Sequence, residues 1–268
     1  MESLNFKLVT FLLIFLFSCN EYQNLLKSDN NSEKFREAEN FYNSGDFKRA
    51  NRLFEDILPF YRGKPQAERL IFFHASSYYN LKMYYLSAAQ FENFIKSYPK
   101  SEKFEEAIFM TAKCYYMLSP IHSLDQKDTN TAIEKLQIFI NNYPNSIYVQ
   151  EANNLISELQ EKLEKKEFEI SKQYYTIRDH KAAIRSVDNF IGEFAGTKYR
   201  EEAMYYKFLS SYEIAVNSIQ SKKIERLKDL KQLHSSIIKY YPETIFLEQL
   251  SSIMLIVEKE INTFAQIN

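Results

Sequence analysis

Apolar residues recur along most of the chain at the three- and four-residue spacing of amphipathic helices. A phrase of the type Phe-Ile-x-x-Tyr-Pro-x-Ser, or a weaker version of it, ends four of these stripes. Its copies occupy residues 94–101, 139–146, 190–197 and 237–244, and a degenerate first copy ends at Tyr61. In each copy a proline or glycine stops one helix, and a Ser or Thr is available to cap the next. The pattern predicts a repeated unit of helix, turn, helix and stop.

Small residues recur inside these predicted hairpins. On the first helix, a small residue precedes an aromatic residue by three positions, in the pairs Ala38/Phe41, Ala75/Tyr78, Ala112/Tyr115 and Ser171/Tyr174. On the second helix, small residues recur at Ala50, Ser87, Ala132 and Ala183. Small side chains let two antiparallel helices approach closely, with the aromatic ring beside them. This arrangement resembles the tetratricopeptide repeat. We predict an all-α solenoid of about five such repeats over residues 33–244, with an inserted loop near residues 119–130.

The last predicted helix, residues 245–264, is strongly apolar on one face. An end repeat needs a cover for its exposed apolar side, so this segment is predicted to be a capping helix. Its unbroken apolar run, residues 253–257, is more apolar than a capping helix requires. The alternative to a capping role is that this helix docks a partner.

Each first helix also carries two aromatic residues seven positions apart. The pairs are Phe35/Tyr42, Phe72/Tyr79, Phe109/Tyr116, Phe168/Tyr175 and Tyr205/Tyr212. Seven residues are nearly two helical turns, so both rings of a pair lie on one face. Stacked repeats therefore set these rings in two rows, here called the Phe row and the Tyr row. The rings either pack between repeats or line a binding surface; a phenol, with its polar end, suits a half-wet groove better than a Phe ring does.

The N-terminus has the organisation of an export signal. Residues 8–17 are almost all apolar, which is too short for a bilayer span of about 20 residues but suits a signal peptide. Ser18-Cys19 follows, which resembles a bacterial lipoprotein signal that is cleaved before an acylated Cys19. An ordinary signal peptide with an incidental Cys, or a buried N-terminal helix, is the alternative. We predict a signal at residues 1–18 and a polar tether at residues 19–32.

Composition excludes several classes of function. The chain holds 22 Phe and 20 Tyr but only four Gly, so Gly-rich phosphate loops and tight β-hairpins are hard to build. A net charge of −1 gives no electrostatic case for binding nucleic acid. The four histidines lie far apart, without metal-ligand spacing. Acidic pairs such as Glu105-Glu106 begin first helices, where their negative charge interacts favourably with the positive end of the helix dipole. We predict no enzyme activity, catalytic residue, metal or cofactor.

Taken together, the Cys19 signal, the polar tether and the Tyr-Pro phrases resemble the BamD family of outer-membrane assembly lipoproteins. That family belongs to the β-barrel assembly machine of Gram-negative bacteria. The resemblance implies a lipid anchor in the outer membrane, a body facing the periplasm, and docking to the periplasmic domains of the barrel insertase. It also implies that the amino-terminal repeats receive unfolded outer-membrane proteins. Other assembly lipoproteins are further possible partners.

Carried onto this chain, the resemblance divides it into a substrate-binding half, residues 33–146, and an insertase-binding half, residues 147–268. The substrate groove would contain Phe35, Tyr42, Asn43, Phe72, Tyr79, Asn80, Phe109 and Tyr116. The insertase would contact Tyr205, Tyr212, Ile253, Met254 and Val257. Two other classes stay open: another exported tetratricopeptide lipoprotein acting as a cell-envelope adaptor, and an enzyme with an unrecognised site.

Overall fold

The structure is a computed structural model that describes residues 21–267, and every regular element in that range is an α-helix. Cys19 and the predicted signal peptide lie outside the described residues. The chain forms two compact units. The first unit comprises Met1–Pro120 and Asp125–Leu159, and the second comprises Ile121–Leu124 and Gln160–Asn268.

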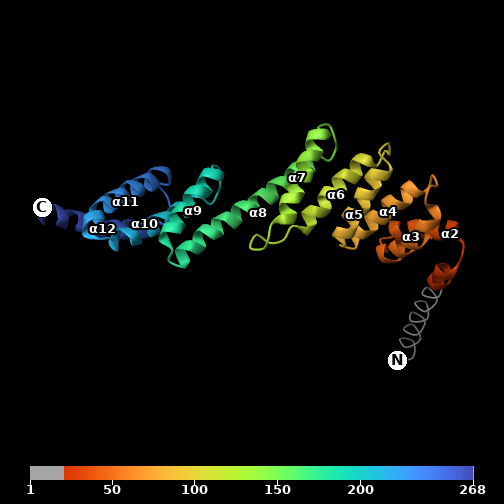
Figure 1. Cartoon of the computed structure of the whole chain (residues 1–268), viewed down its shortest axis with the longest axis horizontal. Helices are drawn as coiled ribbons and strands as arrows, with labels where there is room; N and C mark the ends of the chain where they lie inside the picture. The colour runs from red at the N-terminus through yellow and green to blue at the C-terminus, as the bar shows by residue number, and fades with distance from the viewer. Residues whose placement is uncertain (1–20, 268) are drawn as a thin grey trace, which may run out of the picture. The chain divides into compact units, whose positions relative to one another are not determined.

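Within each unit, successive helices form antiparallel pairs (Figure 1). The first unit holds α2 (Asn31–Asn43) with α3 (Phe47–Tyr61), α4 (Ala67–Asn80) with α5 (Tyr84–Ser97), α6 (Phe104–Leu118) with α7 (Lys127–Asn142), and the start of α8 (Val149–Thr176). The second unit holds the rest of α8 with α9 (His180–Glu193), α10 (Arg200–Val216) with α11 (Gln220–Tyr240), and α12 (Leu247–Ile267). Five hairpins and a last helix confirm the predicted tetratricopeptide-like fold. The units divide at Leu159, inside α8, whereas the sequence placed the boundary after residue 146.

The small residues lie where the two helices of a hairpin meet. All eight of them, on first and second helices, are almost completely buried: Ala38, Ala50, Ala75, Ser87, Ala112, Ala132, Ser171 and Ala183. In the second hairpin the Ser87 hydroxyl donates to the backbone carbonyl of Ala75 at 2.9 Å. In the fourth, the Ser171 and Ser186 hydroxyls are 2.8 Å apart. A hydrogen bond from a side chain to the opposite backbone requires that the helices approach closely, so the predicted role of these residues is confirmed.

The predicted tether at residues 19–32 is wrong for its described part. Residues 21–27 are helical, and α2 already begins at Asn31. Tyr22 meets the edge of Phe41 at a centroid distance of 5.7 Å, and Leu25 and Leu26 pack on the core of the first hairpin. The buried Lys34 ammonium donates to the Leu26 carbonyl at 2.9 Å and pairs with Asp56. Three apolar side chains in a polar stretch were enough to dock it.

The tight turns between hairpin helices use a left-handed residue at one position of the repeat. That residue is Gly45 (φ 83°), Lys82 (φ 60°) and Arg178 (φ 63°). In each turn the following amide donates back to a carbonyl five residues earlier, as in Met83 to Tyr78 at 2.9 Å. This is the Schellman end of a helix, which favours Gly at the left-handed position because a Cβ there is strained. Lys82 and Arg178 therefore carry strain that Gly45 avoids.

We predict that Lys82→Gly stabilises the protein. Removing Cβ relieves a left-handed strain of about 1–2 kcal/mol, offset by the larger backbone entropy of Gly in the unfolded chain, for a net gain of about 0.5–1 kcal/mol. Urea unfolding followed by far-ultraviolet circular dichroism measures the change. Lys82→Val is the control, and it should destabilise the protein. An unchanged or lower urea midpoint of unfolding for Lys82→Gly would contradict the claim that Lys82 is strained.

Candidate functional site

The Phe row is covered by the next repeat rather than exposed. Phe109 stacks on Tyr148 (centroids 4.7 Å, planes 12°), Phe168 on Tyr199 (5.0 Å, 10°) and Tyr205 on Phe246 (4.0 Å, 8°). In the second repeat the covering residue is Lys103, whose ammonium lies 5.4 Å from the Phe72 ring centroid. Each covering residue directly precedes the next first helix. These contacts bury the row from the second repeat on, down to 1% exposure for Phe109. Phe35 of the first repeat packs instead on Tyr61 of its own hairpin.

The Ser and Thr residues of the repeated phrase hold the covering residues in place. Each hydroxyl accepts the N–H two residues on: Ser101 from Lys103 (3.0 Å), and Ser146, Thr197 and Thr244 from Tyr148, Tyr199 and Phe246 (3.2 Å each). The sequence predicted helix caps at these positions. The structure corrects this, because the hydroxyls close short turns that precede the helices. Side-chain caps come instead from Asn30, Asp46 and Asp179.

The Tyr row of the first unit is half-buried. Tyr42 lies against Phe73 at a centroid distance of 4.9 Å. Burial is the main reason that the pKa of Tyr79 is raised to about 12. The Tyr116 hydroxyl donates to Glu158 on α8, and this hydrogen bond is the main cause that raises its pKa to about 12. All three tyrosines thus stay protonated at neutral pH and keep one partly exposed edge.

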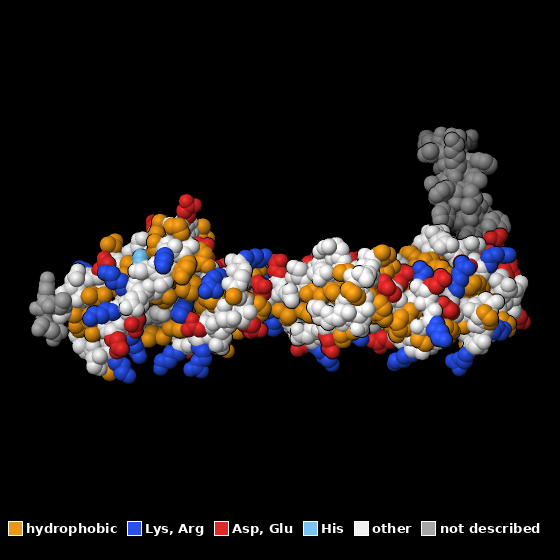
Figure 2. Space-filling view, turned by 90° about the horizontal axis from the view of Figure 1, so that it is seen from above, with side chains coloured by type: hydrophobic (Ala, Val, Ile, Leu, Met, Phe, Trp, Pro, Cys, Tyr) orange, Lys and Arg blue, Asp and Glu red, His pale blue; other side chains and the backbone are white. Residues whose placement is uncertain are grey.

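A groove of about 580 Å³ opens in the first unit between these first helices. Its lining comprises Tyr42, Pro65, Glu68, Arg69, Phe72, Phe73, Phe94, Lys103 and Glu106. Aromatic rings from α2, α4 and α5 form its walls. Over the first unit, hydrophobic side chains are exposed beside basic and acidic ones, in the right-hand half of Figure 2. The groove therefore offers apolar contact together with charge.

The charges of this groove are arranged in pairs. The Arg69 guanidinium is 2.6 Å from Glu39 and lies 5.6 Å from the Phe73 ring centroid. The Lys103 ammonium is 2.8 Å from Glu106, and this hydrogen bond raises the pKa of Lys103. The Arg69 and Lys103 side chains are both more than half exposed, so a ligand carboxylate can reach both of them, while Glu39, the partner of Arg69, is itself only 17% exposed.

Only part of the sequence-predicted groove is assembled here. Tyr42 and Phe72 line it, whereas Phe35, Tyr79, Phe109 and Tyr116 do not. Phe109 in particular is corrected from a substrate contact to a packing residue. Asn43 and Asn80 are both exposed, and the Asn80 amide donates to the Ser76 carbonyl at 2.8 Å.

Sequence reasoning missed the groove residues Glu68, Arg69, Phe73 and Lys103. These residues lie outside the regular positions of the Phe row and the Tyr row. Glu106 was interpreted only as a residue that interacts with the helix dipole. The signal that could have found them is the clustering of charged residues at the starts of neighbouring first helices, since parallel neighbours bring these ends together.

The predicted insertase contacts of the second unit lie in or against its core. Tyr205, Met254 and Val257 are at most 8% exposed, and Tyr212 and Ile253 pack against the same core of α10, α11 and α12. The Tyr205 hydroxyl donates to Gln249 at 2.5 Å. These residues hold α12 in place, in agreement with the capping interpretation. The exposed apolar side chains of α12 include Leu255 (71%), Ile256 (54%) and Leu247 (43%).

Two buried reactive side chains lie outside the groove. Cys114 is fully buried, and burial raises the pKa of its thiol to about 11, so it packs as a small hydrophobe. His74 is 4% exposed, and neither of its ring nitrogens has a hydrogen-bond partner among the described residues. Within residues 21–267, no group of three or more His, Cys, Asp or Glu side chains is placed to hold a metal ion.

Comparison with known proteins identifies the family. A family model described as YfiO, outer membrane lipoprotein, matches residues 27–185 and 172–265. The chain belongs to the YfiO family of outer membrane lipoproteins, which is the BamD family. No curated protein matches it. A solved structure titled "TPR2AB-domain:pHSP90-complex of yeast Sti1" is similar at 12% identity and a TM-score of 0.41, over 85% of this chain and 98% of that one.

Membership of the YfiO family makes the chain an outer membrane lipoprotein with a protein-interaction scaffold. Among the described residues, no helix combines the length and the apolar content that crossing a bilayer requires. The family and the repeat fold are typical of scaffolds rather than of catalysts.

We predict that His74 makes the protein sensitive to acid. Burial lowers the pKa of His74 to about 4, while an unfolded His has a pKa of about 6.5. Between these two values the unfolded chain binds a proton that the folded protein does not. The free energy of unfolding therefore falls as the pH drops from about 6.5 to about 4, by up to about 3 kcal/mol.

Urea unfolding across this range of pH measures the effect. His74→Leu should reduce the loss of stability in acid, and His122→Leu, a change at a loop histidine, should not. A loss of stability that is the same in His74→Leu and in the unchanged protein would contradict the role of His74.

Proposed function

We propose that this YfiO-family protein is a non-catalytic scaffold of the outer-membrane β-barrel assembly machine. The family match, which covers residues 27–265, carries the proposal. The aromatic, charge-rimmed groove of the first unit supports it, because it offers a site for a polypeptide and no constellation for chemistry.

Cys19 is the proposed site of the lipid anchor. The sequence has two cysteines, and Cys114 is fully buried in α6 with its thiol 3.3 Å from the Ser87 hydroxyl. A lipid chain cannot be attached there without breaking the core. In a lipoprotein family this leaves Cys19, after which the body would face the periplasm from the outer membrane.

The proposed clients of the groove are unfolded outer-membrane proteins, bound through their carboxy-terminal segments. Strands of such proteins alternate apolar and polar residues and are rich in aromatics at the membrane interface. Rings such as Phe73 and Tyr42 suit the apolar positions. Arg69 and Lys103 at the rim suit a terminal carboxylate. The second unit would dock to the periplasmic domains of the barrel insertase. Other assembly lipoproteins would be further partners of the complex.

We expect Arg69→Ala with Lys103→Ala to weaken binding of a carboxy-terminal barrel peptide about tenfold, because each change removes a charge-assisted contact. Fluorescence anisotropy with a labelled ten-residue peptide ending in Phe measures this loss. The matched control is Lys96→Ala with Lys100→Ala, two exposed lysines outside the groove.

The same peptide with an amidated end separates the carboxylate from the rest of the ligand. It should bind the unchanged protein about as weakly as the free-acid peptide binds the double variant. Equal affinity of both peptides for the unchanged protein would rule out carboxylate recognition at this rim.

Depletion of the protein in its own cells tests the assembly role directly. The folded amount of many barrel proteins should fall together, seen as loss of their heat-modifiable forms on gels, because a shared scaffold serves them all. Intact barrels after depletion would favour the alternative, an adaptor of the cell envelope that serves other exported proteins. Depletion of an unrelated outer-membrane lipoprotein is the control.

A further inference from the structure

The fifth hairpin exchanges small and large residues at three aligned positions. Aligned on the Phe and Tyr rows, Ser211 occupies the place of four aromatic residues: Phe41, Tyr78, Tyr115 and Tyr174. Phe208 takes the place of the small residue three positions earlier, and Leu230 takes that of the small residue on the second helix. Both are almost completely buried between α10 and α11. In the other hairpins the large side chain lies beside the contact between the two helices. In the fifth hairpin, large side chains lie within that contact.

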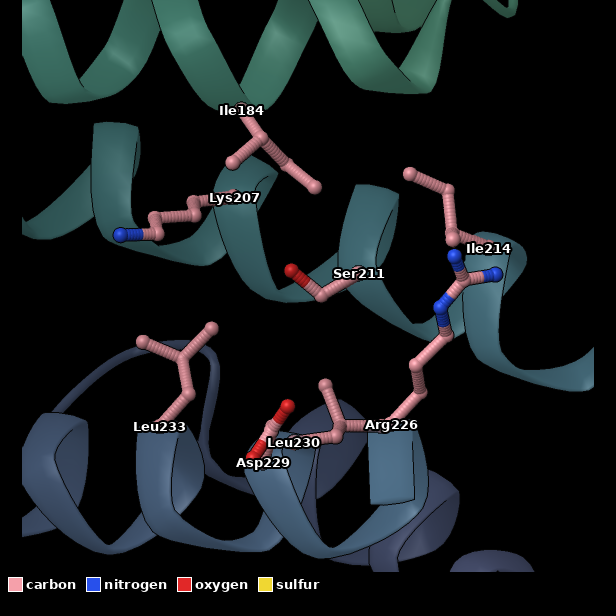
Figure 3. Close-up of a pocket in the computed structure, with 8 residues that line it drawn as sticks. All are labelled: Ile184, Lys207, Ser211, Ile214, Arg226, Asp229, Leu230 and Leu233. Carbon is pink, nitrogen blue, oxygen red and sulfur yellow. The ribbon is translucent and has the colours of Figure 1, made fainter. Parts of the chain in front are cut away.

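This exchange leaves a cavity of about 350 Å³ where the ring would lie. Its lining is Ile184 from α9, Lys207, Ser211 and Ile214 from α10, and Arg226, Asp229, Leu230 and Leu233 from α11 (Figure 3). In the close-up, the Ser211 side chain projects into the space between α10 and α11. Four aliphatic side chains form its walls, and all contributing helices belong to the second unit.

Two of the other hairpins show a ring at this position with a cation beside it. Phe41 lies between Tyr22 of the preceding helix and the Arg49 guanidinium of its own second helix, at 5.7 Å and 5.4 Å. Tyr115 has the Lys135 ammonium of its second helix 5.0 Å from its ring centroid. In these two hairpins a cation from the second helix lies over the ring, whereas Tyr174 of the fourth hairpin is 36% exposed.

The fifth hairpin also brings a cation of its second helix to this place, but from a different register, because Asp229 and Leu233 stand where the first and third hairpins have Arg49 and Lys135. Arg226 of the second helix reaches the cavity, with its guanidinium anchored to the Ser218 hydroxyl at 2.5 Å. Ile184 of the preceding helix forms the opposite wall. Lys207, paired with Asp188 at 2.5 Å, and Asp229 place polar groups at the edge. An aliphatic interior with a fixed guanidinium fits a planar aromatic side chain, and the polar edge fits the backbone that carries it.

We propose that this cavity is a receptor for one aromatic side chain, Phe or Tyr, from a partner polypeptide. The family's role in protein interaction supplies the reason for a polypeptide. Single buried aromatic anchors dominate many interfaces, and a cavity with a guanidinium face is a site of that kind. The proposal concerns a second site, separate from the first-unit groove and independent of what that groove binds.

Ser211→Tyr tests the proposal, because it restores the ring that the other four hairpins have. The variant should fold, with an unfolding temperature raised by about 2–4 °C as the cavity is filled. Ser251→Phe is the matched control, an exposed serine of α12 outside the cavity. The groove peptide should bind Ser211→Tyr unchanged, which keeps this test separate from that of the proposed function.

Binding is measured with p-cresol, the side-chain analogue of Tyr, and with the peptide Ac-Gly-Ser-Tyr-Ser-Gly-amide. On a protein labelled at its Ile methyl groups, both should shift the Ile184 and Ile214 resonances saturably, with a Kd on the order of 1 mM. The shifts should vanish in Ser211→Tyr and persist in Ser251→Phe. A peptide with Ala in place of Tyr should give none.

Three results would overturn the proposal. The first is that p-cresol shifts neither methyl group. The second is that p-cresol shifts both while the Tyr peptide shifts neither, which would make the cavity a small-molecule site. The third is self-association in analytical ultracentrifugation that Ser211→Tyr abolishes, which would assign the cavity to a second copy of this chain.

Discussion

The close approach of two antiparallel helices is the constraint on which this structure depends. Two helix backbones can come together only where both present small side chains, and four of the five hairpins do so at the same two positions. Once these positions are small, bulk must be supplied beside the contact, and the chain supplies it as aromatic rings. The surplus of Phe and Tyr and the scarcity of Gly thus have one cause, which is the need to fill the grooves between closely packed helices.

The same rings also couple one repeat to the next. From the second repeat to the fifth, the residue before the next helix pair or the last helix lies on the Phe-row ring, and a Ser or Thr turn fixes its position. Since Phe109 and Phe168 are occupied in this way, they are unavailable to a ligand, whereas Phe72 also lines the first-unit groove. The surface left for binding consists of the edges of the Tyr row, together with the charges at the starts of the first helices. In the first unit, the exposed rings and these charges together form a groove with apolar walls and a charged rim.

The sequence predicted the fold well because its strongest signals are local and periodic. The small residues, the repeated phrases and the last helix all follow from spacing along one helix or one hairpin. The misses concern contacts between segments. Tyr148 covers Phe109 from 39 positions away, while Tyr199 covers Phe168 from 31, so no fixed spacing reveals the stack. The docking of residues 21–27 depends on three apolar side chains that composition hides in a polar stretch. The groove combines side chains of three first helices, and its charged rim has no periodic signature.

The fifth hairpin meets the constraint on helix approach in a different way. With Phe208 and Leu230 at the helix contact, the contact itself is filled, and a ring at Ser211 is no longer needed to complete it. A repeat protein that only required stability would fill the remaining space, because covering part of an aromatic side chain there is favourable and the four other hairpins each place a ring at this position. Leaving it open, with Arg226 held over it by Ser218, costs stability that a bound ring would return. The one irregular repeat is therefore the place where this otherwise regular scaffold can depend on another chain.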